Sequence, residues 1–173
     1  KPFWDRMAEA GLPLLAHTGG EHTLQVVNAA YANPETLRLP LECGVNVIAA
    51  HAGTGSGPFD PDYVPTLIRL MHEFENLYAD TSALNVPTRS YGLRPCLESE
   101  LLASRVVHGS DYPVPTSPAW AWMRGLIDSD QWATLKKISN PIEQDYQTKV
   151  AAGFPDSHFT RINSLLRTAK EDS

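Results

Sequence analysis

Apolar and polar positions along this chain form blocks that repeat. Four short apolar runs end in polar or small residues, and they cover residues 12–17, 45–51, 76–82 and 105–113. Between these runs lie helix-like segments in which polar and apolar positions are mixed. β-Branched residues in the second and fourth runs are typical of strands, and the small residues after the runs favour loops. The pattern predicts strands that alternate with helices.

The spacing of the polar residues that close these runs predicts the fold class. His17, His51, Asp80 and Asp111 stand 34, 29 and 31 residues apart. A period near thirty is the length of a strand with its crossover helix, and apolar strands alternating with helices favour a covered parallel sheet. Because a complete (β/α)8 barrel takes roughly 250 residues, four units make half of one, and we expect the C-terminal half of a TIM-type barrel. An open four-stranded sheet is the structural alternative.

Pro, Asn and Gly mark where the helices begin and end. We expect helical segments at residues 2–9, 22–31, 33–44, 60–74, 97–103, 117 onward, 128–138, 140 onward and 155–169. The chain is then a single partial domain over 1–173. Its strands with their helices occupy about 1–127, and a helical extension occupies about 128–173.

Composition and charge limit the possible partners. The chain is 42% hydrophobic and 20% charged, which suits one soluble core, and its formal net charge is -6. An acidic chain disfavours nucleic acid and anionic membranes, and no apolar run approaches the roughly 20 residues that span a bilayer. Cys43 and Cys96 form no C-x-x-C pair, so we expect two buried free thiols and a cytoplasmic location.

The strand ends carry side chains suited to metal chemistry. The carboxyl ends of parallel strands meet at one edge, where we expect His17, His51 and Asp111 to converge. Strand alternation assigns them to the faces of Leu15, Ala49 and Gly109, respectively. Two imidazoles and a carboxylate suit a divalent metal with an open position for water. We predict all three as metal ligands, with Asp111 also accepting a proton from the activated water.

Other polar residues are weaker candidates. His22 could line the mouth of the cavity or cap a helix, His108 should face the outer helices, and the direction of Asp80 stays open. Residues 53–57 lack the Gly-Lys-Ser/Thr ending of a phosphate loop, so we expect a flexible active-site loop there. Four further residues are expected near the cavity, namely Tyr112, Trp120, Trp122 and Arg94, the last as a possible anchor for a carboxylate.

Three segments resemble the ends of strands five, six and eight of the amidohydrolase superfamily. They are Leu14–Gly19, Val47–Gly53 and Val107–Pro113, and their order and spacing also match. The branch they resemble contains aminocarboxymuconate semialdehyde decarboxylase and related hydrolases and decarboxylases. The resemblance covers Pro2 to about Phe154. It implies a metal-dependent hydrolase or decarboxylase acting on a small organic acid, amide or lactone.

The resemblance also implies a role for each strand-end residue. His17 is then the strand-five metal ligand, and Asp111 is the strand-eight ligand that handles the proton of the water. His51 is the strand-six histidine, which polarises the substrate, shuttles a proton or binds a second metal. Residues 80–82 match the strand-seven end, a wall facing the substrate. The implied cofactor is a divalent metal, with zinc as the first expectation.

One part of the superfamily pattern is missing from this chain. Its first-strand His-x-His pair has no counterpart, because the six histidines stand at 17, 22, 51, 72, 108 and 158. We interpret this as truncation, since the chain also lacks an initiator Met, and we expect the isolated chain to hold metal weakly and to be inactive. Two exposed sheet edges predict self-association.

A second hypothesis stays open beside the enzyme. In it the chain is a non-catalytic α/β half-barrel module for binding or assembly, and the strand-end residues make structural hydrogen bonds. The enzyme hypothesis predicts a small-molecule substrate and a metal as partners. The module hypothesis predicts no metal and an intact, soluble dimer.

Overall fold

Four short parallel strands form the sheet, in the order β1-β2-β3-β4. The structure is a computed structural model that describes residues 1–22 and 25–166. The strands are β1 (Leu14–His17), β2 (Val47–Ala50), β3 (Leu77–Asp80) and β4 (Val106–Val107). Leu14 pairs with Val47, and Val47 pairs with Leu77, so the first three strands start level with one another. The predicted parallel sheet and α/β class are confirmed.

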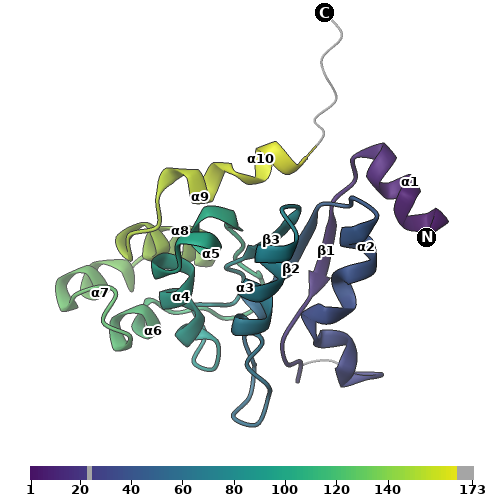
Figure 1. The fold of residues 1–173 in the computed structure, drawn as a ribbon. Helices are drawn as coiled ribbons and strands as arrows, with labels where there is room; N and C mark the ends of the chain where they lie inside the picture. Colours follow the sequence, from purple (N-terminus) through teal and green to yellow (C-terminus); the bar gives the residue numbers. More distant parts are fainter. Residues whose placement is uncertain (23–24, 167–173) are drawn as a thin grey trace, which may run out of the picture.

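Helices and single turns connect the strands and continue after β4 (Figure 1). The helices are α1 (Pro2–Ala10), α2 (Arg38–Glu42), α3 (Val64–Glu73), α4 (Leu93–Glu98), α5 (Glu100–Arg105), α6 (Pro118–Met123), α7 (Ser129–Leu135), α8 (Pro141–Ala151), α9 (Asp156–Thr160) and α10 (Ile162–Leu165). In the described part of the chain, four 3-10 turns complete them, η1 (Ala29–Ala32), η2 (Pro34–Leu37), η3 (His51–Gly53) and η4 (Ser90–Gly92). Within the described ranges, no helix is long and apolar enough to cross a bilayer.

Capping residues set the helix starts that the sequence predicted. The Asn140 side chain accepts hydrogen bonds from the amides of Ile142 and Glu143, with Pro141 in the first turn of α8. Ser117 caps α6 in the same way. The helices expected from residues 117 and 140 are therefore confirmed.

The helix expected over residues 155–169 is divided into α9 and α10, and its residues 167–169 lie outside the description. Two further expected helices also differ from the structure. Residues 25–28 are not helical and only η1 follows, so the helix expected over residues 22–31 is absent from its described part; residues 23–24 lie outside the description. α3 starts at Val64, where Asp62 caps the amide, and not at Asp60. Both changes leave polar residues on loops beside β1, where they can line a pocket.

The strands separate two layers of apolar side chains. Val47, Ala49 and Leu77 are fully buried and belong to the main core that the covering helices share. Ile48 and Val107 point to the opposite face and belong to a smaller cluster. Alternation along each strand produces this division, and it leaves the second face to carry the chemistry.

β4 is an edge strand whose outward backbone groups are already bonded. The Val107 carbonyl accepts a hydrogen bond from the Thr81 amide, 3.1 Å away, on the side of β3. Neighbouring residues of a strand point their backbone groups to opposite sides, so those of Val106 and His108 point outward. The His108 amide donates to the His158 carbonyl at 3.1 Å, and the Val106 carbonyl accepts from His158 Nδ1 at 3.3 Å.

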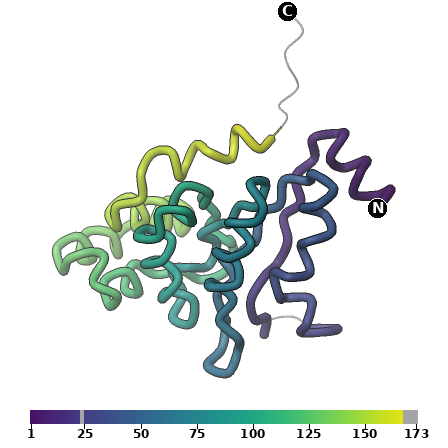
Figure 2. Tube along the Cα trace, in the orientation of Figure 1, coloured from purple at the N-terminus to yellow at the C-terminus, as the bar shows by residue number. Residues whose placement is uncertain are grey.

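The C-terminal segment therefore covers this edge and part of the second face. The Arg161 guanidinium also donates to the Val106 carbonyl, and Leu165 of α10 packs in the cluster of Ile48 and Val107. The trace shows the segment returning across the sheet after the chain has run from one end of the molecule to the other (Figure 2). The expectation of two exposed edges is thus wrong for β4. β1 is the other edge strand, and its Leu15 is 65% exposed.

Candidate functional site

His17 is the last residue of β1 and lies on the second face of the sheet. It shares that face with Leu15, as alternation predicts, and its own side chain is 39% exposed. Its register partner on β2 is Ala50, whose side chain belongs to the same face. The imidazole is therefore presented at the carboxyl edge of the sheet, beside the end of β2.

His51 reaches the same place through an unusual backbone. Alternation would put it on the face of Ala49, inside the main core. β2 ends at Ala50, however, and His51 and Ala52 take left-handed backbone conformations with φ of 61° and 50°. Such conformations are strained for residues other than Gly and are found preferentially at functional sites. The turn brings His51 Nε2 to 3.3 Å from His17 Nδ1.

The His51 ring is held from its other nitrogen. Nδ1 lies 3.0 Å from the Ser82 carbonyl and 2.9 Å from Ser82 Oγ. Asp80 Oδ1 accepts from the backbone amides of His51 at 2.8 Å and Ser82 at 3.0 Å, and from the Ser82 hydroxyl. A carbonyl partner requires a proton on Nδ1, so the Nε2 lone pair faces His17. Asp80, whose direction the sequence left open, is thus a buried support for His51.

Burial keeps the His51 ring neutral. It is the main cause that lowers the pKa of His51, and the positive charge of Arg89 lowers this pKa further. The Ser82 carbonyl and the charges of Asp80 and Asp111 act in the opposite direction without reversing the shift. A neutral imidazole at pH 7 is the form that binds a metal or accepts a proton.

Asp111 lies near the histidines but does not join them. Its backbone is left-handed, with φ of 65°, and its carboxylate acts electrostatically on His51 and Arg89. Over residues 1–22 and 25–166, no group of three or more His, Cys, Asp or Glu side chains is placed to hold a metal ion. The structure thus brings two of the three predicted ligands together and leaves the third outside coordinating distance.

The two imidazole nitrogens have the spacing of two ligands on one metal ion. Tetrahedral zinc with Zn–N distances of about 2.0–2.1 Å separates its nitrogen ligands by roughly 3.3–3.4 Å. His17 Nδ1 and His51 Nε2 are 3.3 Å apart. The donor chemistry and the spacing fit two corners of such a site.

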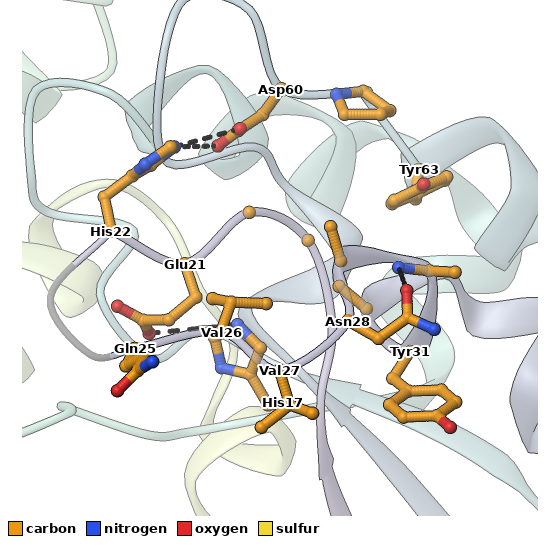
Figure 3. Close-up of a pocket in the computed structure, with 16 residues that line it drawn as sticks. His17, Glu21, His22, Gln25, Val26, Val27, Asn28, Tyr31, Asp60 and Tyr63 are labelled. Carbon is orange, nitrogen blue, oxygen red and sulfur yellow. Dashed lines mark hydrogen bonds and ion pairs between the residues drawn. The ribbon is translucent and has the colours of Figure 1, made fainter.

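A pocket of about 630 Å³ adjoins His17 (Figure 3). Its walls come from the loop after β1 and from residues 60–63 before α3. Glu21 Oε2 lies 3.9 Å from His17 Nε2, and His22 faces Asp60 at the other end of the view. Sequence reasoning left His22 undecided and missed Asp60, because the latter was expected to cap a helix.

Four residues expected near the cavity do not line this pocket. Arg94 donates to Glu98 and to the Arg124 carbonyl on the exposed surface, so it is not an anchor for substrate here. The Trp122 ring stacks on Trp132, 4.9 Å between centroids, in the contact of α6 with α7. Tyr112 and Trp120 are likewise absent from the lining. Arg89, which sequence reasoning did not single out, is buried and donates hydrogen bonds to the Gly20 and Thr54 carbonyls of the loops after β1 and β2.

Both cysteines are free, as predicted, but they differ in exposure. Cys96 is buried, and burial raises the pKa of its thiol to about 12. Cys43 is only partly buried, contrary to expectation. Neither thiol takes part in the histidine site.

Comparisons with known proteins agree with this fold. A family model described as amidohydrolase matches residues 1–147. An uncharacterized TIM-barrel protein from Bordetella bronchiseptica has a similar structure, with a TM-score of 0.51 and 23% sequence identity. The similarity covers 86% of this chain and 50% of that one, so this chain spans about half the length of the barrel protein. No curated protein matches the sequence. The four parallel strands and their helices therefore correspond to a partial barrel.

Proposed function

This chain belongs to the amidohydrolase family, and from that premise we propose that it carries part of the active site of a divalent-metal hydrolase or decarboxylase. The observation that supports the proposal most is the meeting of His17 Nδ1 with His51 Nε2 at 3.3 Å. It comes from two strand ends at the carboxyl edge of a parallel sheet, where barrel enzymes place their catalytic groups. The reaction and substrate of the whole protein are part of this proposal.

His17 and His51 would hold the metal, with zinc as the ion that suits them first. When bound, such an ion makes water available as a nucleophile near neutral pH and polarises a carbonyl group. Strands that precede β1 in the whole protein would supply the remaining ligands. The isolated chain would then hold metal weakly, since catalytic zinc sites use three protein ligands.

The side chains around the pair have distinct tasks in this proposal. Ser82 and Asp80 fix the His51 ring so that its Nε2 lone pair stays directed at the site. Asp111 would be the group that accepts a proton from a water activated at this site, because its carboxylate is half-buried and lies within electrostatic reach of His51. Arg89 holds the loop carbonyls of Gly20 and Thr54 and so shapes the wall beside His17.

Metal analysis of the whole protein tests the proposal. We expect His17→Ala and His51→Ala to lose most of the bound metal, because each removes one of two ligands in this half. Asp111→Ala should retain metal but lower kcat by about 10²-fold or more, as expected for a lost proton acceptor. Bound zinc and the turnover of a panel of amides and lactones are measured together.

His72→Ala is the matched control, since His72 is exposed on α3 and lies outside the site. It should keep both metal and turnover. Full metal content and full turnover in His17→Ala would contradict the proposal.

A second candidate function is the non-catalytic module. The observation that favours it is that both nitrogens of His51 already have hydrogen-bond partners within the chain, Ser82 and His17. Thermal unfolding with increasing zinc separates the two, because a ligand that binds only the folded state raises Tm. A rise in Tm with zinc that is lost in His17→Ala supports the metal site. If zinc does not raise the Tm of the whole protein, the result supports the module.

A further inference from the structure

The turn that carries His51 has a left-handed backbone over three successive residues. His51, Ala52 and Gly53 have φ of 61°, 50° and 73°, and all three are buried. For a residue other than Gly this conformation costs free energy, and it persists only where the surrounding structure holds it. The bonds that hold this turn therefore determine where the His51 ring lies.

Thr54 closes the turn from within its own loop. The Thr54 amide donates to the His51 carbonyl at 3.0 Å, and the Thr54 hydroxyl donates to the same carbonyl at 2.7 Å. These two bonds fix the shape of the turn. They do not join it to β1, the strand that carries His17.

Thr18 joins the turn to β1, and it directly follows His17 in the chain. Its hydroxyl donates to the Ala50 carbonyl at 2.6 Å and accepts from the Gly53 amide at 3.2 Å. A hydroxyl has one donor and two acceptor lone pairs, so a single oxygen can make both bonds. Ala50 ends β2 and Gly53 ends the turn, so this oxygen bonds on both sides of the two strained residues between them.

Thr18 is enclosed by protein. It is 1% exposed, and it is not among the described residues that line the pocket beside His17. Losing its hydroxyl would leave the Ala50 carbonyl and the Gly53 amide without these partners in a buried place, which is costly. Thr18 can therefore affect a ligand in the pocket only through the residues that it holds.

The loops after β1 and β2 also touch beyond Thr18. Gly19 has φ of 82°, and a Cβ atom there would lie 2.0 Å from the Thr54 carbonyl oxygen. The Arg89 guanidinium donates to the Gly20 and Thr54 carbonyls. These contacts keep the outer parts of the two loops together, whereas the bonds of Thr18 lie next to the histidines in the chain.

We infer that Thr18 is a positioning residue for the proposed metal site, whose hydroxyl sets the 3.3 Å separation of His17 Nδ1 and His51 Nε2. The inference rests on the proposed function for the metal. Asp80 and Ser82 orient the His51 ring, and Thr18 fixes its distance from His17. Partners behind metal ligands typically contribute about 10–100-fold to metal affinity or activity, because they hold the ligands in place before the ion binds.

NMR of the whole protein, freed of metal by EDTA, tests the geometry alone. The rings of His17 and His51, with centroids 4.9 Å apart, should show a nuclear Overhauser contact, and the Gly53 amide should exchange slowly with solvent. Thr18→Val removes the hydroxyl and nearly keeps the shape. We expect it to weaken the ring contact and to accelerate Gly53 exchange about tenfold or more, whereas Thr18→Ser should preserve both.

Two results of this measurement would overturn the inference. One is an unchanged ring contact with unchanged Gly53 exchange in folded Thr18→Val. The other is rapid Gly53 exchange in the unmodified protein, which decides the matter even if Thr18→Val does not fold.

Zinc affinity and turnover of the same variants test the consequence for the site. Thr18→Val should weaken zinc binding about tenfold or more and lower kcat with little change in KM, and Thr18→Ser should restore both. Thr148→Val is the matched control, because Thr148 is also 1% exposed and its hydroxyl donates to the Gln144 carbonyl at 2.6 Å within α8. It should keep its zinc affinity. Unchanged affinity in Thr18→Val, or an equal loss in Thr148→Val, contradicts the inference.

The two proposals fail separately. If the unmodified whole protein binds no zinc, the metal site of the proposed function is wrong. The ring contact and the Gly53 exchange, both measured without metal, still show whether Thr18 holds the two histidines together.

Discussion

At the scale of single residues, His158 shows how the fold uses a histidine without exposing it. The side chain is fully buried, its Nδ1 donates to the Val106 carbonyl, and its Nε2 accepts from Thr81 Oγ1 at 3.2 Å. Burial is the main cause that lowers the pKa of His158 to about 3, against a backbone hydrogen bond that acts to raise it. The nearby ring of His108 has its pKa lowered to about 4 for the same main reason.

These two pKa values predict acid sensitivity. The unfolded chain binds a proton on each ring near pH 6.5, whereas the folded chain resists protonation down to the lowered pKa. The free energy of unfolding should therefore fall as the pH drops below 6.5, by about 2–3 kcal/mol for His158 between pH 7 and pH 4.5. Urea unfolding at several pH values measures this pH dependence of the free energy of unfolding. His158→Gln should flatten the dependence and exposed His72→Gln should not; an unchanged slope in His158→Gln would refute the assignment.

At the scale of elements, α8 is tied to the loop after β4 by a buried ion pair. Lys149 Nζ donates to Asp145 Oδ2 at 2.6 Å and to the Gly109 carbonyl at 2.7 Å, and the Asn85 amide donates to Asp145 Oδ1 at 2.8 Å. Lys149 is completely buried, and burial is the main cause that lowers its pKa. The pair thus fixes the backbone two residues before Asp111.

Removing one partner of this pair should cost more than replacing both. Lys149→Met leaves the Asp145 carboxylate buried and uncompensated, and we expect a loss of about 3–5 kcal/mol in the free energy of unfolding. The double variant Asp145→Leu/Lys149→Met removes both charges and should be the more stable of the two. Urea midpoints compare them, with exposed Lys137→Met as control. A double variant less stable than Lys149→Met would show that the charges are not the main cause.

The elements also show how far the sequence predicts this structure and where prediction stops. Apolar runs and a period near thirty suffice for the parallel sheet, and the Asn140-Pro141 pair suffices for the start of α8. Alternation places His17 correctly but not His51, because a left-handed turn is a property of backbone packing that the residue types His51 and Ala52 do not signal. The partners of Asp60 likewise depend on loops brought together in space.

At the scale of the whole molecule, the C-terminal segment takes the place where another strand would pair with β4. His158 and Arg161 satisfy the outward backbone groups of that edge, and Leu165 covers part of the second face. An unpaired edge recruits strands from other molecules. Among the residues that the structure describes, β1 is the edge strand that no such segment covers. Self-association of the chain, still a prediction, is then restricted to one side.

Displacing α10 should open the second edge. Leu165→Asp puts a charge among apolar side chains, and we expect it to lower the free energy of unfolding by about 2–3 kcal/mol or to detach the helix. Hydrogen exchange at the His108 amide should accelerate, and sedimentation should show larger species as concentration rises. Asn163→Asp adds the same charge on the exposed side of α10 and should do neither. Slow hydrogen exchange at His108 and unchanged sedimentation in Leu165→Asp would show that α10 does not protect the β4 edge from pairing with other molecules.

The covered edge of β4 also determines how the molecule would respond to force. His158 and Arg161, which lie toward the C-terminal end of the described chain, bond to Val106 and His108 at the β4 edge, and Leu165 of α10 adds an apolar contact. If the chain were pulled between its two ends, the force would act first on the few hydrogen bonds of His158 and Arg161. These bonds would break one after another, and α9 and α10 would detach from β4. The hydrogen bonds of the sheet would come under force only after that. The molecule should therefore extend in two steps, and the step that needs the lower force should be the detachment of the C-terminal segment.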